Sequence, residues 1–296
     1  MIKIGINGFG RIGRAITRII SSKKDFKILA INEINNDVSN LTYLLKYDTI
    51  YGKLKSKISA KKNEIYLRNN KIKFFHKKNI TEVPWNKLGV DIVIDATGIA
   101  KNVQDAKKII KNSVKKVLIT HSPEKNIDFT MIMGVNEKLY KYKKHHVISS
   151  SICDASAIGP VLKVLNDSFE IETGFVTTLH PRLSYQNLLD GSLKSVSSPG
   201  HNWKDFSLGR DSISNLIPKH TTAVKAVTRC MNSLKNKISG LSFRVPTSIV
   251  CASDLTIKVK KNTSTEEIKK IFKYLSIKNN KIFEYETQSL VSSDYL

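Results

Sequence analysis

The chain has few acidic residues, few cysteines and no long apolar run. It holds 25 Asp and Glu against 49 Lys and Arg, and three cysteines in 296 residues. No stretch approaches the roughly 18 continuous apolar residues of a membrane span, and the N-terminus lacks the layout of a signal peptide. Three cysteines suit no disulfide framework. These absences argue against a secreted disulfide-rich domain and a membrane span, and they predict a cytoplasmic protein.

The net charge of +24 is spread along the chain. Only eight of the cationic residues are arginine, and the lysines are scattered rather than gathered on one helix with interleaved aromatics. No nucleic-acid fold signature accompanies them. The charge should attract anions, including phosphorylated metabolites, but specific nucleic-acid binding is not expected.

A glycine-rich loop follows the first apolar strand, residues 2–6. Gly8, Gly10 and Gly13 form G-x-G-x-x-G between this strand and a helix. The first glycine permits a tight turn, the second lets backbone approach a pyrophosphate, and the third lets helix pack on strand. This order predicts a Rossmann dinucleotide site with the pyrophosphate at the helix N-terminus. The helix carries one apolar face, made of Ile12, Ala15, Ile16 and Ile19.

Further cofactor residues are expected at the carboxyl ends of the next strands. Glu33 ends the second strand, where an acid accepts hydrogen bonds from the adenosine ribose and favours NAD over NADP. Lys27 and Lys46 lie nearby in sequence, so NADP stays open. Thr97-Gly98 closes a buried apolar strand, and Thr120 ends the following one, placed to meet the nicotinamide side.

Cys153 lies at the predicted N-terminus of a helix. Backbone N–H groups and the helix dipole favour a thiolate there, and the thiolate is the nucleophile. The strand of residues 174–179 ends at His180, whose imidazole could return beside the sulfur. A buried cysteine and an unrelated histidine are the ordinary alternative for such a pair. The long segment 181–218 is expected to be mostly loop, with His201, Trp203 and Arg210 as candidate substrate contacts.

Other elements follow from apolar periodicity. An added hairpin is expected around Ile58 and Ile65, with Asn69-Asn70 as a turn before a strand at residues 72–75. Later strands are expected at residues 131–135, 146–149, 241–245 and 250–259. A last helix is expected over residues 263–274, with Thr265 as its cap.

By this point the motifs resemble those of the glyceraldehyde-3-phosphate dehydrogenase family. NGFGRIGR, VDIVIDATG, VISSSIC, TTLH, FRVPT and LVSSDY occur in that family's order, and the likeness covers essentially the whole chain. The resemblance implies an α/β fold, with an NAD-binding Rossmann domain at residues 1–150 and an α+β catalytic domain with a mixed sheet at residues 151–296. It also implies a homotetramer, a place in glycolysis, and NAD-dependent oxidation of a small phosphorylated aldehyde through a cysteine thioester. No metal is implied.

The resemblance assigns roles by position. Cys153 matches the nucleophile and His180 the general base, while Glu33 stands where Asp is more usual and Thr120 where Ser is usual. The remaining matched positions are Arg11 and Ile12 in the dinucleotide loop, and Thr221 and Arg244 at the anion sites.

The departures from the family gather at those anion sites. Hydroxyl residues flanking the nucleophile are replaced by Ile152 and Asp154, and two threonines beyond the histidine are replaced by Leu183 and Tyr185. An ionised Asp154 would repel incoming phosphate, although a first-turn acid also suits the helix dipole. The family continues past LVSSD with a strand and a C-terminal helix. The sequence stops at Leu296, so either it is truncated or the protein lacks that helix.

Three functions therefore remain open. The first is a phosphorylating glyceraldehyde-3-phosphate dehydrogenase, favoured by the whole-chain resemblance. The second is a divergent aldehyde dehydrogenase of the same fold, acting on another sugar aldehyde or without inorganic phosphate. The third is a non-catalytic nucleotide-binding or RNA-interacting protein, against which the retention of Cys153 and His180 argues.

Overall fold

The computed structural model describes residues 1–192 and 206–295, and it splits into two compact units. One unit comprises residues 1–131 and 136–152, and the other comprises residues 132–135 and 153–296. His201 and Trp203 lie outside the described residues. No helix in the described part of the chain is both long enough and apolar enough to cross a bilayer.

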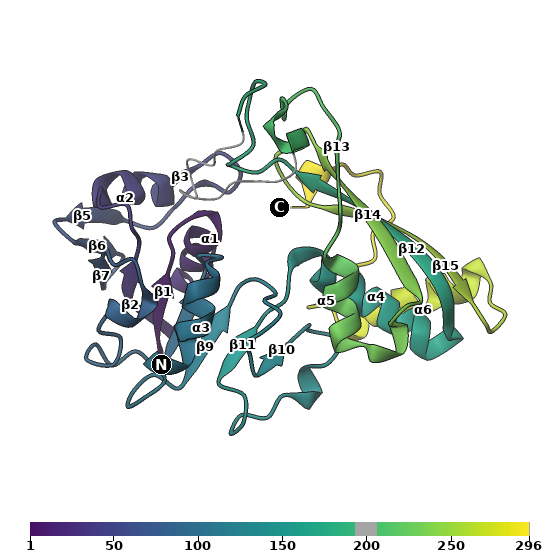
Figure 1. The fold of residues 1–296 in the computed structure, drawn as a ribbon, viewed down its shortest axis with the longest axis horizontal. Helices are drawn as coiled ribbons and strands as arrows, with labels where there is room; N and C mark the ends of the chain where they lie inside the picture. Colours follow the sequence, from purple (N-terminus) through teal and green to yellow (C-terminus); the bar gives the residue numbers. More distant parts are fainter. Residues whose placement is uncertain (193–205, 296) are drawn as a thin grey trace. The chain divides into compact units, whose positions relative to one another are not determined.

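The first unit is built on a nine-stranded sheet (Figure 1). Its order is β10-β11-β9-β8-β1-β2-β7-β6-β5, with parallel pairing from β10 to β7 and antiparallel pairing among β7, β6 and β5. The strands are β1 (Ile2–Asn7), β2 (Phe26–Asn32), β5 (Ile58–Lys61), β6 (Glu64–Leu67), β7 (Asn70–Phe75), β8 (Ile92–Asp95), β9 (Lys116–Ile119), β10 (Phe129–Thr130) and β11 (Val147–Ser149). The expected Rossmann sheet and its added hairpin are therefore present.

Helices and short elements connect these strands. They are α1 (Arg11–Ser21), α2 (Val38–Lys46), α3 (Ala100–Ile109), the two-stranded ribbon of β3 (Tyr47–Asp48) and β4 (Gly52–Lys53), and the 3₁₀ turns η1 (Ile80–Glu82) and η2 (Glu137–Leu139). Asp37 caps α2 by accepting from the Asn40 backbone N–H at 3.0 Å. Ile4, Ile6 and Ile31 from the central strands are almost fully buried and anchor the core.

Only part of the apolar face expected for α1 packs on the sheet, because Ile16 contacts the core but Ile12 and Ile19 do not. Gly13, Thr17 and Ile20 are buried, whereas Ile12 and Ile19 are 53% and 60% exposed. The reason is the third glycine of the loop, since a Cβ on Gly13 would lie 2.1 Å from the Gly8 carbonyl oxygen. The helix turns its smallest residue toward the strand, Ile16 and Ile20 pack against the core, and Ile12 and Ile19 face outward in this unit.

The strand expected at residues 131–135 is wrong. Pairing ends with β10 at Thr130, and the chain then turns through Gly134, whose φ of +81° is a conformation that favours glycine. A Cβ on Gly134 would also lie 2.9 Å from Ile282. The apolar residues of this segment therefore pack as a turn, not as a paired strand.

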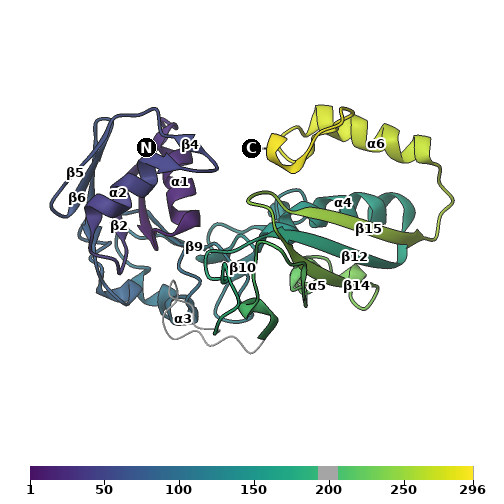
Figure 2. The same ribbon diagram turned by 90° about the horizontal axis from the view of Figure 1, so that it is seen from above.

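The second unit is built on a mixed four-stranded sheet, in the order β13-β14-β12-β15 (Figures 1 and 2). β12 pairs parallel with β14 and antiparallel with β15. Helix α4 packs on β12 and β15, and α5 packs on α4 and β14. The elements are α4 (Cys153–Phe169), β12 (Ile171–Pro181), η3 (Phe206–Gly209), β13 (Ile217–Lys219), α5 (Ala223–Cys230), η4 (Asn232–Leu234), β14 (Ile238–Val245), β15 (Ala252–Val259), α6 (Thr265–Lys278) and η5 (Ser292–Asp294).

The last helix is confirmed, but its expected cap is wrong. The residue before α6, Ser264, accepts from the Glu267 backbone N–H at 3.2 Å. Thr265 is instead the first helical residue. Serine and threonine compete for the same role at this boundary, and the extended backbone of Ser264 is the one suited to a cap.

Candidate active site

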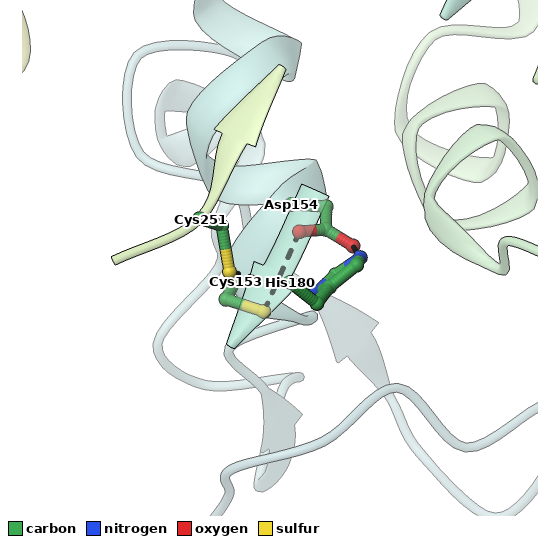
Figure 3. Close-up of side chains that lie close together, drawn as sticks. All are labelled: Cys153, Asp154, His180 and Cys251. Carbon is green, nitrogen blue, oxygen red and sulfur yellow. Dashed lines mark hydrogen bonds and ion pairs between the residues drawn. The ribbon is translucent and has the colours of Figure 1, made fainter. Parts of the chain in front are cut away.

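Four side chains of the second unit converge at one end of its sheet (Figure 3). Cys153 and Asp154 open α4, His180 lies near the end of β12, and Cys251 immediately precedes β15. Each offers a donor atom within 4.8 Å of the others, a spacing that one soft divalent cation could also bridge. The antiparallel register that pairs Leu179 with Ala252 sets His180 beside Cys251.

His180 is buried and hydrogen-bonded on both ring nitrogens. Nε2 lies 2.9 Å from Asp154 Oδ2, 3.1 Å from Thr178 Oγ1 and 3.3 Å from Ser242 Oγ, whereas Nδ1 lies 3.5 Å from Cys251 Sγ. Burial lowers the pKa of His180, but the hydrogen bonds to Asp154 and Cys153 and the Asp154 charge outweigh it and raise the pKa to about 9. His180 is therefore an imidazolium at neutral pH.

Cys153 is the first residue of α4 and is exposed as a residue. Hydrogen bonds with Cys251 and then His180 lower the pKa of Cys153 to about 5, against the effects of burial and of the Asp154 charge. Asp154 Oδ1 is 3.7 Å from Cys153 Sγ. The pKa of Cys251 is raised by its hydrogen bond to Cys153 and by burial. At neutral pH the site therefore combines one thiolate, one imidazolium and one thiol.

The two expected anion-site residues flank this cluster differently. Arg244 lies opposite His180 in the pairing of β12 with β14, and its Nη1 donates to the Pro181 carbonyl at 3.1 Å. Its Nε is buried and has no hydrogen-bond partner among the described residues. Thr221 Oγ1 accepts from the Ala223 backbone N–H at 3.0 Å, before α5. Arg244 and Thr221 are therefore each partly engaged by the protein itself.

The glycine loop of the first unit fits a pyrophosphate. Gly8 has φ +93°, and a Cβ there would lie 2.8 Å from Thr97 Cγ2, whereas a Cβ on Gly10 would meet nothing within 4 Å. Gly98, after β8, also has a positive φ of +70°. Helix α1 begins with no side-chain cap and no acidic residue in its first turn. Its first N–H groups remain available to an anion.

Glu33 and Arg11 both contact the protein around this loop. Glu33 Oε2 accepts from the Phe9 backbone N–H at 2.7 Å, and Oε1 accepts from that of Asn35 at 3.3 Å. Arg11 forms an ion pair with Asp48. Glu33 therefore ties the loop to the end of β2 while keeping lone pairs for a ribose, and the charge of Arg11 is already matched.

A buried polar network under the loop was not anticipated from the sequence. Asn32 donates to Asn7 Oδ1 and Asn7 donates to Asp95 Oδ1, each at 2.7 Å, and Thr97 Oγ1 donates to the same carboxylate oxygen at 2.9 Å. Burial raises the pKa of Asp95 to about 6, although these hydrogen bonds oppose the shift. Thr120 Oγ1 donates to the Asp95 carbonyl at 3.2 Å. Thr97 and Thr120, both expected near the cofactor, thus meet at Asp95.

Three members of the His180 surroundings were also missed: Thr178, Ser242 and Cys251. Thr178 could have been found, because it lies two residues before His180 and side chains alternate along a strand. Ser242 lies on β14 and Cys251 directly before β15, so only the register of the sheet brings them to the imidazole.

Comparisons with known proteins identify the family. The model described as "Glyceraldehyde 3-phosphate dehydrogenase, NAD binding domain" matches residues 2–103, and "Glyceraldehyde 3-phosphate dehydrogenase, C-terminal domain" matches residues 150–296. The chain is 38% identical to glyceraldehyde-3-phosphate dehydrogenase 1 of Kluyveromyces lactis, over 100% of this chain and 86% of that protein. It is 38% identical to glyceraldehyde-3-phosphate dehydrogenase of Chlamydia pneumoniae, and 37% identical to glyceraldehyde-3-phosphate dehydrogenase 1 of Bacillus cereus, in each case over 100% of this chain and 85% of the relative. The chain belongs to the glyceraldehyde-3-phosphate dehydrogenase family.

Proposed function

We propose that this protein oxidises glyceraldehyde 3-phosphate, or a closely related phosphorylated aldehyde, with NAD through a thioester on Cys153. Family membership supports the cofactor and the substrate class. The observation that carries the assignment is the pairing of Cys153 with His180, because a non-catalytic protein has no need for a thiolate beside an imidazolium.

The protonation states support a sequence of proton transfers. The Cys153 thiolate attacks the aldehyde carbon, and the His180 imidazolium donates a proton to the developing alkoxide, giving a hemithioacetal. The neutral imidazole then takes that proton back as the C–H bond breaks and the thioester forms. The Gly8–Gly13 loop and Glu33 would hold NAD, which would supply the hydride acceptor. Asp154 keeps Nε2 bonded throughout and stabilises the charged ring.

The phosphate group of the substrate suits Arg244, with Thr221 as a second donor. Arg244 lies on β14 opposite His180, and an arginine recognises phosphate through a fixed fork of N–H donors. The site that would bind inorganic phosphate beside Cys153 should have a lower affinity than in the family, because Ile152 and Asp154 replace the hydroxyl residues expected there. A buried, 4% exposed carboxylate lies 3.7 Å from the sulfur and would repel the incoming anion. This feature favours a second candidate, an enzyme that releases a free acid to water.

The acceptor is tested by measuring NADH formation from a panel of aldehydes, with and without phosphate. Losing one hydrogen bond to a charged group costs about 1.5–3 kcal/mol, roughly tenfold or more in affinity. We expect weak phosphate dependence with a very high Michaelis constant for phosphate. Ile152→Ser, which leaves the Asp154–His180 pair intact, should strengthen it. Saturation of the unmodified protein at ordinary millimolar phosphate would contradict the weakened site and leave the phosphorylating reaction.

The remaining expectations complete this proposal. Residues 1–150 would bind the dinucleotide, residues 151–296 would carry catalysis, and the active form would be a homotetramer in the cytoplasm, where thiols stay reduced. The apolar side chains of Phe175 and Leu179 on β12, 46% and 39% exposed in the single chain, support self-association. Light scattering of the purified protein would report the mass. A monomer that oxidises aldehydes at full rate would contradict the tetramer.

A further inference from the structure

The mechanism leaves one thiol of the cluster unused. Cys251 Sγ and Cys153 Sγ belong to the group whose donor atoms lie within 4.8 Å of one another, and Figure 3 shows the two cysteine side chains next to each other. Cys251 Sγ also lies 3.5 Å from His180 Nδ1. The third cysteine, Cys230, ends α5 and is outside this group. Two thiols and a proton-transfer group therefore meet at one point.

We propose that Cys251 is a resolving thiol, which forms a reversible disulfide with Cys153 after a peroxide has oxidised Cys153. The inference adds a regulatory modification to the proposed function, and the loss of activity that it implies rests on that function. The disulfide itself rests only on the arrangement of the three side chains.

The chemistry balances in two steps. The Cys153 thiolate attacks a peroxide oxygen, so that an S–O bond forms, the O–O bond breaks, and the other oxygen leaves as water or an alcohol after protonation. Cys251 sulfur then attacks Cys153 sulfur, so that the S–S bond forms and the S–O bond breaks. In the first step the His180 imidazolium gives its proton to the oxygen that leaves the peroxide, so the ring is then neutral. The neutral imidazole accepts the Cys251 proton and passes it to the departing hydroxide, which leaves as water. One peroxide thus consumes two thiols and is reduced by two electrons.

The two sulfurs are suited to different halves of this sequence. Cys153 is exposed and its pKa is lowered, so at neutral pH it is the thiolate that peroxides attack. Cys251 is partly buried and its pKa is raised, so it remains a thiol until His180 is ready to take its proton. Oxidation is therefore directed to Cys153 first, and Cys251 waits beside it.

The segment that carries Cys251 is a turn rather than a paired strand. Residues 246–251 lie between β14 and β15, and Val250 has φ +41°, an uncommon conformation for a β-branched residue. A disulfide needs an S–S distance of about 2.05 Å, so the sulfurs must approach. Movement in this turn disturbs no strand pairing, because β15 begins at Ala252.

The test treats the reduced full-length protein with one equivalent of hydrogen peroxide in the presence of a chelator. Thiol titration, mass spectrometry of proteolytic peptides and NADH formation are then followed before and after dithiothreitol. We expect two thiols to be lost per peroxide, a crosslinked peptide joining Cys153 to Cys251, and lost activity that dithiothreitol restores. Cys230→Ser should behave in the same way.

The variant Cys251→Ser keeps a hydroxyl donor but removes the resolving sulfur. Its own starting activity is the reference, and for this comparison both proteins receive at least two equivalents of peroxide, because a sulfinic acid consumes two. In the variant we expect no crosslink, sulfinic acid on Cys153, and inactivation that dithiothreitol does not reverse. Equal sulfinic acid in the unmodified protein and in Cys251→Ser, or a crosslink to Cys230, would overturn the inference. The peptide readout needs no substrate: a crosslink without aldehyde turnover would refute only the proposed function, and turnover without a crosslink would refute only this inference.

Discussion

Replacing His180 should raise the pKa of Cys153, because the Asp154 carboxylate then lies beside the sulfur without the neighbouring imidazolium. In His180→Asn, Cys153 keeps the hydrogen bond with Cys251 that lowers its pKa but loses the hydrogen bond and the positive charge of His180, while Asp154 Oδ1 stays 3.7 Å from the sulfur. A thiol with pKa about 5 is about 99% thiolate at pH 7, and one at the ordinary value of about 8.5 is about 3% thiolate. Alkylation by iodoacetamide at pH 7 should therefore slow, by roughly 30-fold if the pKa returns to its ordinary value. The remaining Cys251 hydrogen bond reduces this effect, and repulsion by the Asp154 carboxylate increases it.

The double variant His180→Asn/Asp154→Asn separates the two charges. Two unit charges at 3.7 Å interact by about 4 kcal/mol at an effective dielectric of about 20, and exposure of Cys153 reduces this upper bound. We expect the double variant to recover at least about one pKa unit, or tenfold in alkylation at pH 7, relative to His180→Asn.

The assay is the alkylation rate from pH 4 to pH 10, with the modified residue identified by mass spectrometry. The unmodified protein should show a midpoint near pH 5, with the rate falling as pH drops below it. A midpoint that stays near pH 5 in His180→Asn would refute the role of the imidazolium. Equal plots of alkylation rate against pH for the single and double variants would show that the Asp154 charge does not affect the pKa of Cys153.

Three further predictions concern the first unit. Glu33→Ala should weaken NAD binding and reduce the difference in affinity between NAD and NADP, because it removes a ribose acceptor and the 2.7 Å contact to Phe9. Calorimetric titrations measure both affinities, and unchanged values would mean that Glu33 contacts only protein. Gly13→Ala should lower the melting temperature, since its Cβ would lie 2.1 Å from a carbonyl oxygen. Gly10→Ala should melt like the unmodified protein but bind NAD more weakly. Equal melting temperatures for Gly13→Ala and the unmodified protein would contradict the close packing at Gly13. The raised pKa of Asp95, about 6, means that the folded state binds the carboxyl proton more tightly than the unfolded state does. The destabilisation caused by ionising Asp95 should therefore disappear as pH falls from about 6 toward 4. In denaturant unfolding, Asp95→Asn should lack this gain in free energy of unfolding, and parallel plots of that free energy against pH for the two proteins would refute the prediction.

Local patterns in the sequence predicted much of this architecture. The apolar strands with Gly8, Gly10 and Gly13 between them predicted the Rossmann unit, because each of these signals is contained within one strand–loop–helix segment. The same reasoning put Cys153 at the start of a helix and His180 at the end of a strand, and both positions are confirmed.

The remaining features depend on distant contacts. The sequence predicted that Asp154 repels phosphate or is stabilised by the helix dipole. It did not predict the 2.9 Å contact with His180, which arises only when α4 packs on β12. Cys251 gave no signal because its partners are 98 and 71 positions away in the chain. The outward isoleucines of α1 likewise reflect packing of Gly13 against Gly8, which outweighed the apolar periodicity.

The central claim, a thioester on Cys153, is tested most directly by a single-turnover experiment without phosphate. Excess enzyme with NAD and glyceraldehyde 3-phosphate is quenched in acid, and NADH and the mass of the Cys153 peptide are measured together. The account predicts NADH equal to the acyl groups found on Cys153, with neither formed by Cys153→Ser. NADH without an acyl adduct, an adduct on another residue, or turnover by Cys153→Ser would contradict it.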